Sequence, residues 1–336
     1  MASSVRCVSL IPLMGPFHLH YPLYNAVSVR DTVKAFTPDG LATTALNPGA
    51  FANPGWQDTP ELALPLSVVP WARSHGLALE AVGEPSPDPT ASTDFVRYLR
   101  EYAGERNLLS EIEGAGRAVE ALLGEALTLE RIFDELLPAV RSYHELREDR
   151  FGDGPGTDWL RARANAMAER ILALPGRRLA VLAGVDELPF LQDALGDQIE
   201  RVVPPQVSLS EAARRRGLLD FAFRLDVSEP GNVIAQLREL NNAEARYLEA
   251  NLLFANGHAA EALELLEQTS QGDFSSPYYL PGYLLARLGQ LRDLASDRSG
   301  ALRAYRGVQA LEYAPPEARE AAERGLEEPF KVMSNA

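Results

Sequence analysis

The sequence has little cysteine, little positive charge and no long apolar run. Its 336 residues include one cysteine, Cys7, so the chain cannot form a disulfide framework. Cys7 alternates with Val5, Ser9 and Ile11 on an expected strand, which favours a buried structural thiol over a nucleophile. The longest apolar run is far below the ~18 residues that span a bilayer. We therefore expect no membrane span and, by default, a cytoplasmic protein.

The shortage of positive charge argues against a nucleic-acid partner. The chain carries 32 Lys and Arg residues against 47 Asp and Glu residues, a formal net charge of −15. Binding to phosphates needs a cationic face that releases counterions. The one basic cluster is Arg214, Arg215 and Arg216, and a short charge run on a helix is usually a solvated face.

Common nucleotide-binding and catalytic motifs are also missing. The chain has no Gly-x-Gly-x-x-Gly and no Gly-x-x-x-x-Gly-Lys loop, so nothing predicts a phosphate cradle. It has no Gly-x-Ser-x-Gly elbow, and Cys7 has no positioned base. Covalent acyl transfer is therefore not expected.

Strand-like and helix-like segments alternate over the first 205 residues, which favours a parallel sheet. The expected helices cover 25–36, a segment beginning at Asp58-Thr-Pro-Glu61, and a segment from Thr157 or Asp158 to Leu174. Between about 91 and 150, apolar residues spaced by three, four and seven predict a helical insertion, with breaks at Gly114, Gly116 and Pro138. A Gly-rich loop is expected at 152–156. The expected strands are 5–14, 41–46, 77–82, 178–183 and 199–203.

From about residue 232 the sequence is helical to its end. The stretches 250–266 and 289–305 each place a small residue, a second small residue twelve positions later, and a bulky residue four further on. This pattern resembles the tetratricopeptide repeat, with Ala262 and Ala301 at the close-packing position. A plain helical hairpin would produce the same pattern.

The expected fold is an α/β domain followed by an all-α, repeat-like domain. The first domain covers 1–205, with a mostly parallel sheet flanked by helices and the helical insertion at about 91–150. The second covers 206–336. Its helices need neighbours to bury their apolar faces, either on the first domain or in a homo-oligomer.

Two strands end in related motifs, Gly15-Pro-Phe-His18 and Gly184-Val-Asp-Glu187. Ligands gather at the carboxyl ends of strands in open α/β sheets, so we expect one shared site. His18 and His20 would point the same way on an extended segment, which would suit a metal or a phosphate. Glu84, Asp186 and Glu187 could reach the same rim. Alternatively, both histidines are hydrogen-bonded residues that shape an aromatic loop.

The order and spacing of four motifs resemble the TraB/Tiki/ChaN-like superfamily of α/β proteins. They are Gly15-Pro-Phe-His18, Phe36-Thr-Pro-Asp39, Arg163-Ala-Asn-Ala-Met167-Ala168 and Gly184-Val-Asp-Glu187-Leu-Pro189. The chain departs from the family pattern at two points. Its second strand ends at Thr43-Thr44-Ala45-Leu46-Asn47 without a carboxylate, and Glu187 stands where the second histidine is usual.

The resemblance implies hydrolysis with one divalent metal, zinc or manganese. It makes His18, Glu187 and Arg163 candidate catalytic residues. The candidate metal ligands are His18, His20, Glu84 and Glu187. The two departures favour a different hypothesis, a degenerate member that acts by binding a ligand or protein, with the helical region holding a protein or peptide. A metal-dependent hydrolase with a rearranged site is the alternative.

Overall fold

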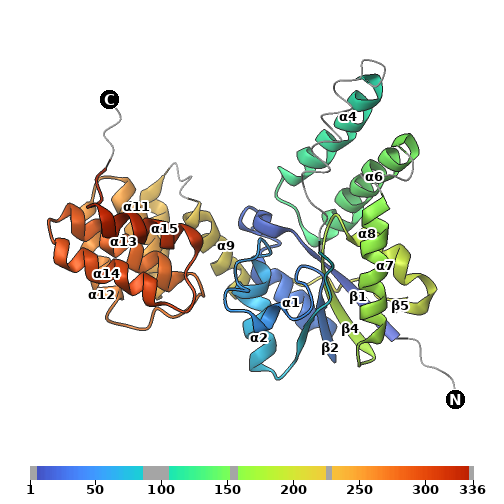
Figure 1. Cartoon of the computed structure of the whole chain (residues 1–336), viewed down its shortest axis with the longest axis horizontal. Helices are drawn as coiled ribbons and strands as arrows, with labels where there is room; N and C mark the ends of the chain where they lie inside the picture. The colour runs from blue at the N-terminus through green and yellow to red at the C-terminus, as the bar shows by residue number, and fades with distance from the viewer. Residues whose placement is uncertain (1–5, 86–105, 152–157, 225–228, 333–336) are drawn as a thin grey trace. The chain divides into compact units, whose positions relative to one another are not determined.

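The computed structural model describes residues 6–85, 106–151, 158–224 and 229–332 (Figure 1). The chain divides into two compact units. The first consists of Met1–Ala52 and Thr59–Ala213, and the second of Asn53–Asp58 and Arg214–Ala336. The expected loop at 152–156 and the first part of the expected insertion, 91–105, lie outside the described residues.

The first unit is built on a five-stranded sheet in which every neighbouring pair is parallel, in the order β3-β2-β4-β1-β5. All five strands lie where the sequence predicts them. Their bounds are β1 Arg6–Leu13, β2 Gly40–Thr43, β3 Leu79–Ala81, β4 Arg178–Gly184 and β5 Ile199–Arg201.

The two longest strands, β1 and β4, lie side by side near the middle of the sheet. Both are near-continuous apolar runs, as expected for strands covered on both faces. Their register places Leu13 opposite Gly184, so the two strands end together. The two Gly-x-x motifs therefore begin at neighbouring strand ends.

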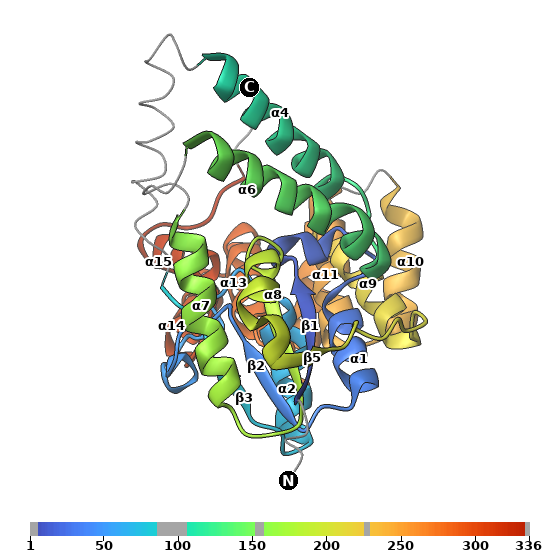
Figure 2. The ribbon, with the colours of Figure 1, turned by 90° about the vertical axis from the view of Figure 1, so that its right-hand side faces the viewer.

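Helices cover both faces of the sheet (Figures 1 and 2). One face carries α1 (Ala26–Phe36) and α2 (Val69–Ser74), which continues the π-helical turn η3 (Leu64–Val68). The other face carries α7 (Asp158–Ala173) and α8 (Leu188–Leu195). Asn25 caps α1 by accepting the backbone N–H groups of Val27 and Ser28.

The predicted helix start at Asp58-Thr-Pro-Glu61 is wrong, since helical structure begins only at Ala63. The hydroxyl of Thr59 accepts the N–H of Glu61 at 3.2 Å, which forms a local turn before the helix. The carboxylate of Glu61 is turned away to the end of β1, where it accepts the N–H of Gly15.

The described part of the insertion is helical, and α4 packs along α6 at a distance from the sheet (Figure 2). Its elements are α4 (Arg106–Leu123), α5 (Leu129–Arg131), η5 (Ile132–Leu136) and α6 (Leu137–Phe151). The predicted breaks at Gly114 and Gly116 are wrong, because α4 runs through both, at a cost of only about 1 kcal/mol per glycine. Pro138 also lies inside helical structure, just after the π-helical turn η5.

The second unit is helical. Its first helix, α9, begins at Glu211, at the end of the first unit, and continues past Arg214, so helical structure starts ahead of residue 232. The helices are α9 (Glu211–Phe223), α10 (Pro230–Leu240), α11 (Ala243–Ala255), α12 (Ala259–Thr269), α13 (Leu280–Leu294), α14 (Arg298–Ala310) and α15 (Pro316–Glu327). Short loops join α11 to α12 and α13 to α14, so the unit contains two successive helix hairpins. None of the helices in the described ranges combines the length and apolarity that crossing a bilayer requires.

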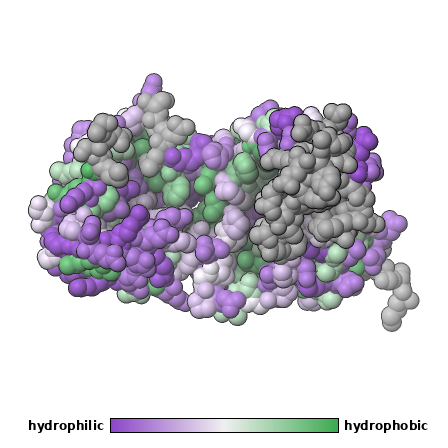
Figure 3. Space-filling model, turned by 45° about the horizontal axis from the view of Figure 1, so that its top comes forward, coloured by the Kyte–Doolittle hydropathy of each residue, from purple (hydrophilic) through white to green (hydrophobic). Residues whose placement is uncertain are grey.

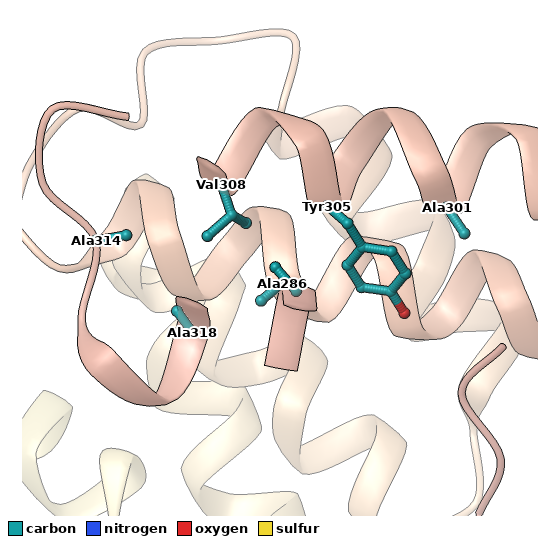
Figure 4. Packing of buried hydrophobic residues seen from close by; sticks show 7 residues of the cluster. Ala286, Ala301, Tyr305, Val308, Ala314 and Ala318 are labelled. Carbon is teal, nitrogen blue, oxygen red and sulfur yellow. The ribbon is translucent and has the colours of Figure 1, made fainter. Parts of the chain in front are cut away.

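Close packing in the second hairpin depends on small residues around Tyr305 (Figure 4). Ala262 and Ala301, at matching positions of the two hairpins, are both fully buried. The ring of Tyr305 lies against Gly289 of α13 and Gly325 of α15. A Cβ atom at either glycine would come within 2.4 Å of ring atoms of Tyr305. The glycines therefore let α13, α14 and α15 approach around one aromatic ring.

On the surface, Figure 3 shows a mostly hydrophilic face with apolar residues in small patches.

We expect Gly289→Ala to destabilise the protein by about 1–3 kcal/mol, because the added methyl group overlaps the Tyr305 ring. Urea denaturation of the full chain measures this loss. Gly231→Ala on α10 is the matched control, since a Cβ there meets nothing within 4 Å. Equal midpoints for both variants would contradict the packing described here.

Candidate functional site

The carboxyl ends of β1 and β4 form a topological switch point. The chain leaves β1 through α1 on one face of the sheet, and it leaves β4 through α8 on the other face. Neighbouring strands whose connections lie on opposite faces leave a crevice between their ends, the usual ligand position in such sheets. The two Gly-x-x motifs therefore lie where the fold itself favours a site.

Glu61 lies between the glycines of the two motifs. Its Oε2 accepts the backbone N–H of Gly15 at 2.8 Å. Its Oε1 lies 3.9 Å from the place where a Cβ of Gly15 would be and 4.0 Å from that of Gly184. Gly15 also has a positive φ of 56°, which favours glycine there. The carboxylate thus occupies space that the two glycines leave open.

Glu187, at the end of β4, is held by two polar side chains. Its Oε2 accepts the hydroxyl of Thr44 at 2.6 Å, and its Oε1 pairs with Arg163 of α7 at 2.8 Å. Thr44 directly follows β2, so the strand without a terminal carboxylate contributes a hydroxyl to Glu187. The structure therefore brings Arg163 and Glu187 together, as the motifs suggest.

Arg163 also links the carboxyl end of β4 to the segment that follows β3. It donates from Nε and Nη2 to the backbone carbonyl of Glu84, at 3.0 and 2.7 Å. The carboxylate of Glu84 turns away and pairs with Arg170, further along α7. Glu84 thus contributes its backbone rather than its carboxylate to the neighbourhood of Glu187.

Burial raises the pKa of three carboxyl groups near the carboxyl ends of β1 and β4. Desolvation, with a smaller contribution from the charge of Glu187, raises the pKa of Glu61 to about 7. Desolvation also raises the pKa of Asp186. It raises the pKa of Glu187 as well, although Thr44 and Arg163 act in the opposite direction. Glu61 is therefore partly protonated near neutral pH, and it can either donate or accept a proton.

His18 is part of the loop structure rather than of the open edge. It is 1% exposed, its Nε2 accepts the N–H of Met14 at 3.1 Å, and its Nδ1 lies 2.8 Å from the carbonyl of Tyr24. These partners assign a neutral ring with the proton on Nδ1. Burial lowers the pKa of His18 to about 4. Both ring nitrogens are thus used by the backbone.

The expectation that His18 and His20 point the same way is wrong. Residues Gly15–Leu19 form the 3₁₀ helix η1 instead of an extended segment. Residues two apart in a 3₁₀ helix lie on different sides, because one turn takes three residues. His18 is buried, whereas His20 is exposed.

The four candidate metal ligands do not fit one metal ion as they are arranged. Both nitrogens of His18 bond to the backbone, His20 lies on another side of η1, and Glu84 pairs with Arg170. Within the described ranges, no three His, Cys, Asp or Glu side chains are placed to hold a metal.

The Phe36-Thr-Pro-Asp39 motif lies at the opposite end of the sheet from the site. The Asp39 carboxylate accepts the N–H groups of Arg177 and Arg178 at 2.9–3.1 Å, where β4 begins. The guanidinium of Arg178 stacks on Phe36, with 4.5 Å between Cζ and the ring centroid. This motif therefore fixes the start of β4 and contributes nothing to the site.

The second unit contains a groove of about 280 Å³, which we call the tyrosine groove. It lies along the inner helices α9, α11, α13 and α15. The rings of Tyr247 and Tyr283 stack in it, with 6.4 Å between centroids. Its lining residues are Phe223, Tyr247, Asn251, Tyr283, Ala286, Arg287, Gln290, Glu317, Ala318 and Ala321.

Neither Glu61 nor the groove residues are among the candidates that the sequence suggests. The groove residues nevertheless follow a repeated pattern in the sequence. Tyr247 and Ala286 each lie three residues before the first small residue of the two repeat-like stretches. Asn251 and Gln290 each lie one residue after it. Matching positions of the two hairpins therefore line the groove. Glu61 has no such signal, since it stands outside all four motifs.

Comparison with known proteins yields no family: no protein-family model, curated protein or solved structure matches this chain. The resemblances to the TraB/Tiki/ChaN-like superfamily and to tetratricopeptide repeats therefore stay predictions.

We expect His18→Ala to destabilise the protein by about 2–4 kcal/mol, because the N–H of Met14 and the carbonyl of Tyr24 lose their partner inside the protein. Chemical denaturation measures the change. The exposed His20→Ala is the control and should stay within about 0.5 kcal/mol of the parent. An unchanged midpoint for His18→Ala would mean that His18 is not a structural residue.

Glu61 should make stability depend on pH. Its pKa is about 7 in the folded protein and near 4.5 when exposed, so the native state binds the proton more tightly between these values. As the pH falls from 8 to 5, the parent should gain about 2–3 kcal/mol of stability relative to Glu61→Gln.

The measurement is denaturation of the parent and of Glu61→Gln at several pH values. The glutamine keeps an oxygen acceptor for the N–H of Gly15 and removes the titrating group. Glu80→Gln is the control, because it makes the same chemical change at an exposed position of β3. A difference between the parent and Glu61→Gln that stays constant from pH 8 to pH 5 would show that the pKa of Glu61 is not raised.

Proposed function

We propose that this protein acts by binding, and that the tyrosine groove of its helical unit holds an extended segment of a partner protein. The single observation that carries the proposal is the groove itself, a hollow of about 280 Å³ between inner helices. Grooves of this kind, with aromatic walls and a few polar groups, are typical recognition surfaces for peptide segments. As a cytoplasmic protein, it would find such segments on other cytoplasmic proteins.

The contacts in the groove support peptide binding in two ways. Tyr247 and Tyr283 offer stacked rings, and Tyr and Arg are among the residue types that contribute most to protein interfaces. Asn251, Gln290 and Arg287 offer polar groups that can bond to a peptide backbone or side chain. The walls come from helices fixed by internal packing, so little ordering is required when a segment binds.

A second candidate function is hydrolysis of a small molecule at the strand ends. It is favoured by Glu61, a carboxyl group with a pKa of about 7 placed between Gly15 and Gly184. Such a group suits general acid–base catalysis near neutral pH. Any substrate turnover at these strand ends should depend on Glu61. The Glu61→Gln variant therefore also serves as the inactive control for hydrolysis.

Peptide binding can be tested with a displayed library of random twelve-residue peptides selected on the full chain. Enriched peptides are then synthesised with both ends blocked, and their Kd is measured by fluorescence anisotropy. We expect the groove variants Tyr283→Ala and Gln290→Trp to weaken binding at least about 10-fold, because one removes a wall and the other fills the groove.

The matched control is Ala260→Arg, which adds bulk at an exposed position of α12 outside the groove and should bind like the parent. Denaturation midpoints show whether each variant is folded. The proposal is wrong if no peptide is enriched, or if the enriched peptides bind folded groove variants as tightly as the parent.

A further inference from the structure

Arg287 is a cation inside the tyrosine groove without a carboxylate partner among the described residues. Three other arginines of the helical unit each pair with a carboxylate: Arg216 with Glu244 at 2.8 Å, Arg292 with Glu267 at 3.0 Å, and Arg298 with Asp293 at 3.0 Å. For Arg287, the only hydrogen bond within the described part of the chain runs from Nε to the amide oxygen of Asn251, at 2.9 Å.

The two neighbours of Arg287 hold its guanidinium in one orientation. Besides the bond to Asn251, the group lies over the ring of Phe254, with 5.1 Å between Cζ and the ring centroid. Nε is therefore occupied, and the terminal nitrogens Nη1 and Nη2 keep their N–H groups without a partner in the described residues. Paired N–H groups of this type match the two oxygens of a carboxylate.

Leaving this cation without a counter-ion is unfavourable for the free protein. Burial lowers the pKa of Arg287, which reflects the cost of removing the charge from water. A guanidinium does not escape that cost by losing its proton at physiological pH. A carboxylate from a partner would offset the cost, so the arrangement favours an anionic ligand group.

Other charges restrict what kind of anion fits. Glu317 also lines the groove, where its carboxylate accepts the hydroxyl of Tyr283 at 3.1 Å, and it would repel a second negative charge. The chain as a whole has a net charge of −15, which repels strongly acidic partners. A single carboxylate in a neutral or basic segment meets both conditions.

Given peptide binding in the tyrosine groove, on which this inference rests, we propose that Arg287 receives the side-chain carboxylate of one Asp or Glu inside the bound segment. The stacked rings of Tyr247 and Tyr283 then pack against the residues that flank this acid. The groove thus selects internal segments that carry one acidic residue among apolar, neutral or basic ones.

The test is a double-mutant cycle on the end-blocked peptides recovered with the full chain. Each acidic residue of a peptide is replaced by its amide, Glu by Gln or Asp by Asn. On the parent protein, the amide peptide should bind about 10- to 100-fold more weakly, the range of a charge-assisted hydrogen bond. On Arg287→Gln, the acid and amide peptides should bind within about twofold of each other. Arg287→Lys should retain part of the preference, because it keeps the charge without the two parallel N–H groups.

Four outcomes separate this inference from the proposed function. Peptides that depend on Tyr283 and Gln290 but contain no acid overturn the carboxylate assignment and leave groove binding intact. Acid-to-amide losses that persist in folded Arg287→Gln also overturn it. A peptide without acidic side chains that binds through Arg287 only when it is resynthesised with a free C-terminus overturns the side-chain source. If no peptide depends on the groove, the proposed function fails and this inference fails with it.

Discussion

The inner helices of the second unit are held in register by one buried cluster of charged and polar groups. Arg216 on α9 donates to Asp220 on the same helix and to Glu244 at the start of α11, both at 2.8 Å. Tyr279, directly before α13, donates its hydroxyl to Glu244. All four residues are at most 7% exposed. Three helices therefore meet at Glu244.

This cluster restricts how the helices can slide past one another. Removing a charge from water costs several kcal/mol, and the cost is offset only while each charge keeps its partner. A shift of α11 by one turn would separate Glu244 from Arg216. The tyrosine groove lies further along the same helices, so its walls at Phe223, Tyr247 and Tyr283 depend on this alignment. The prediction of a solvated basic run holds for Arg214 and Arg215, which are exposed, but it is wrong for Arg216.

Much of the fold could be predicted from the sequence, whereas the site residues could be predicted only in part. Apolar runs bounded by Gly and Pro predict all five strands. Burial is near-continuous along the central strands β1 and β4, whereas the edge strands β3 and β5 are partly exposed. The direction of side chains in the loops could not be predicted, because it depends on the local backbone conformation. The 3₁₀ helix η1, for example, keeps His18 and His20 from pointing the same way. Glu61 was missed for a similar reason. Its role arises from a chain reversal that brings it to Gly15, 46 positions earlier in the sequence.

Glu61 at the strand ends and Arg287 in the groove each lack an ion-pair partner among the described residues, and the chemistry of each group decides the consequence. Glu61 can lose its charge by taking a proton, as its pKa of about 7 indicates, so burial there produces an acid–base group. Arg287 cannot respond in this way, because a guanidinium keeps its proton throughout the physiological range. Its charge can be balanced only by an anion from outside the described residues. Burial at the strand ends thus favours the proton transfer of the second candidate function, whereas burial in the groove favours the anion binding that we propose.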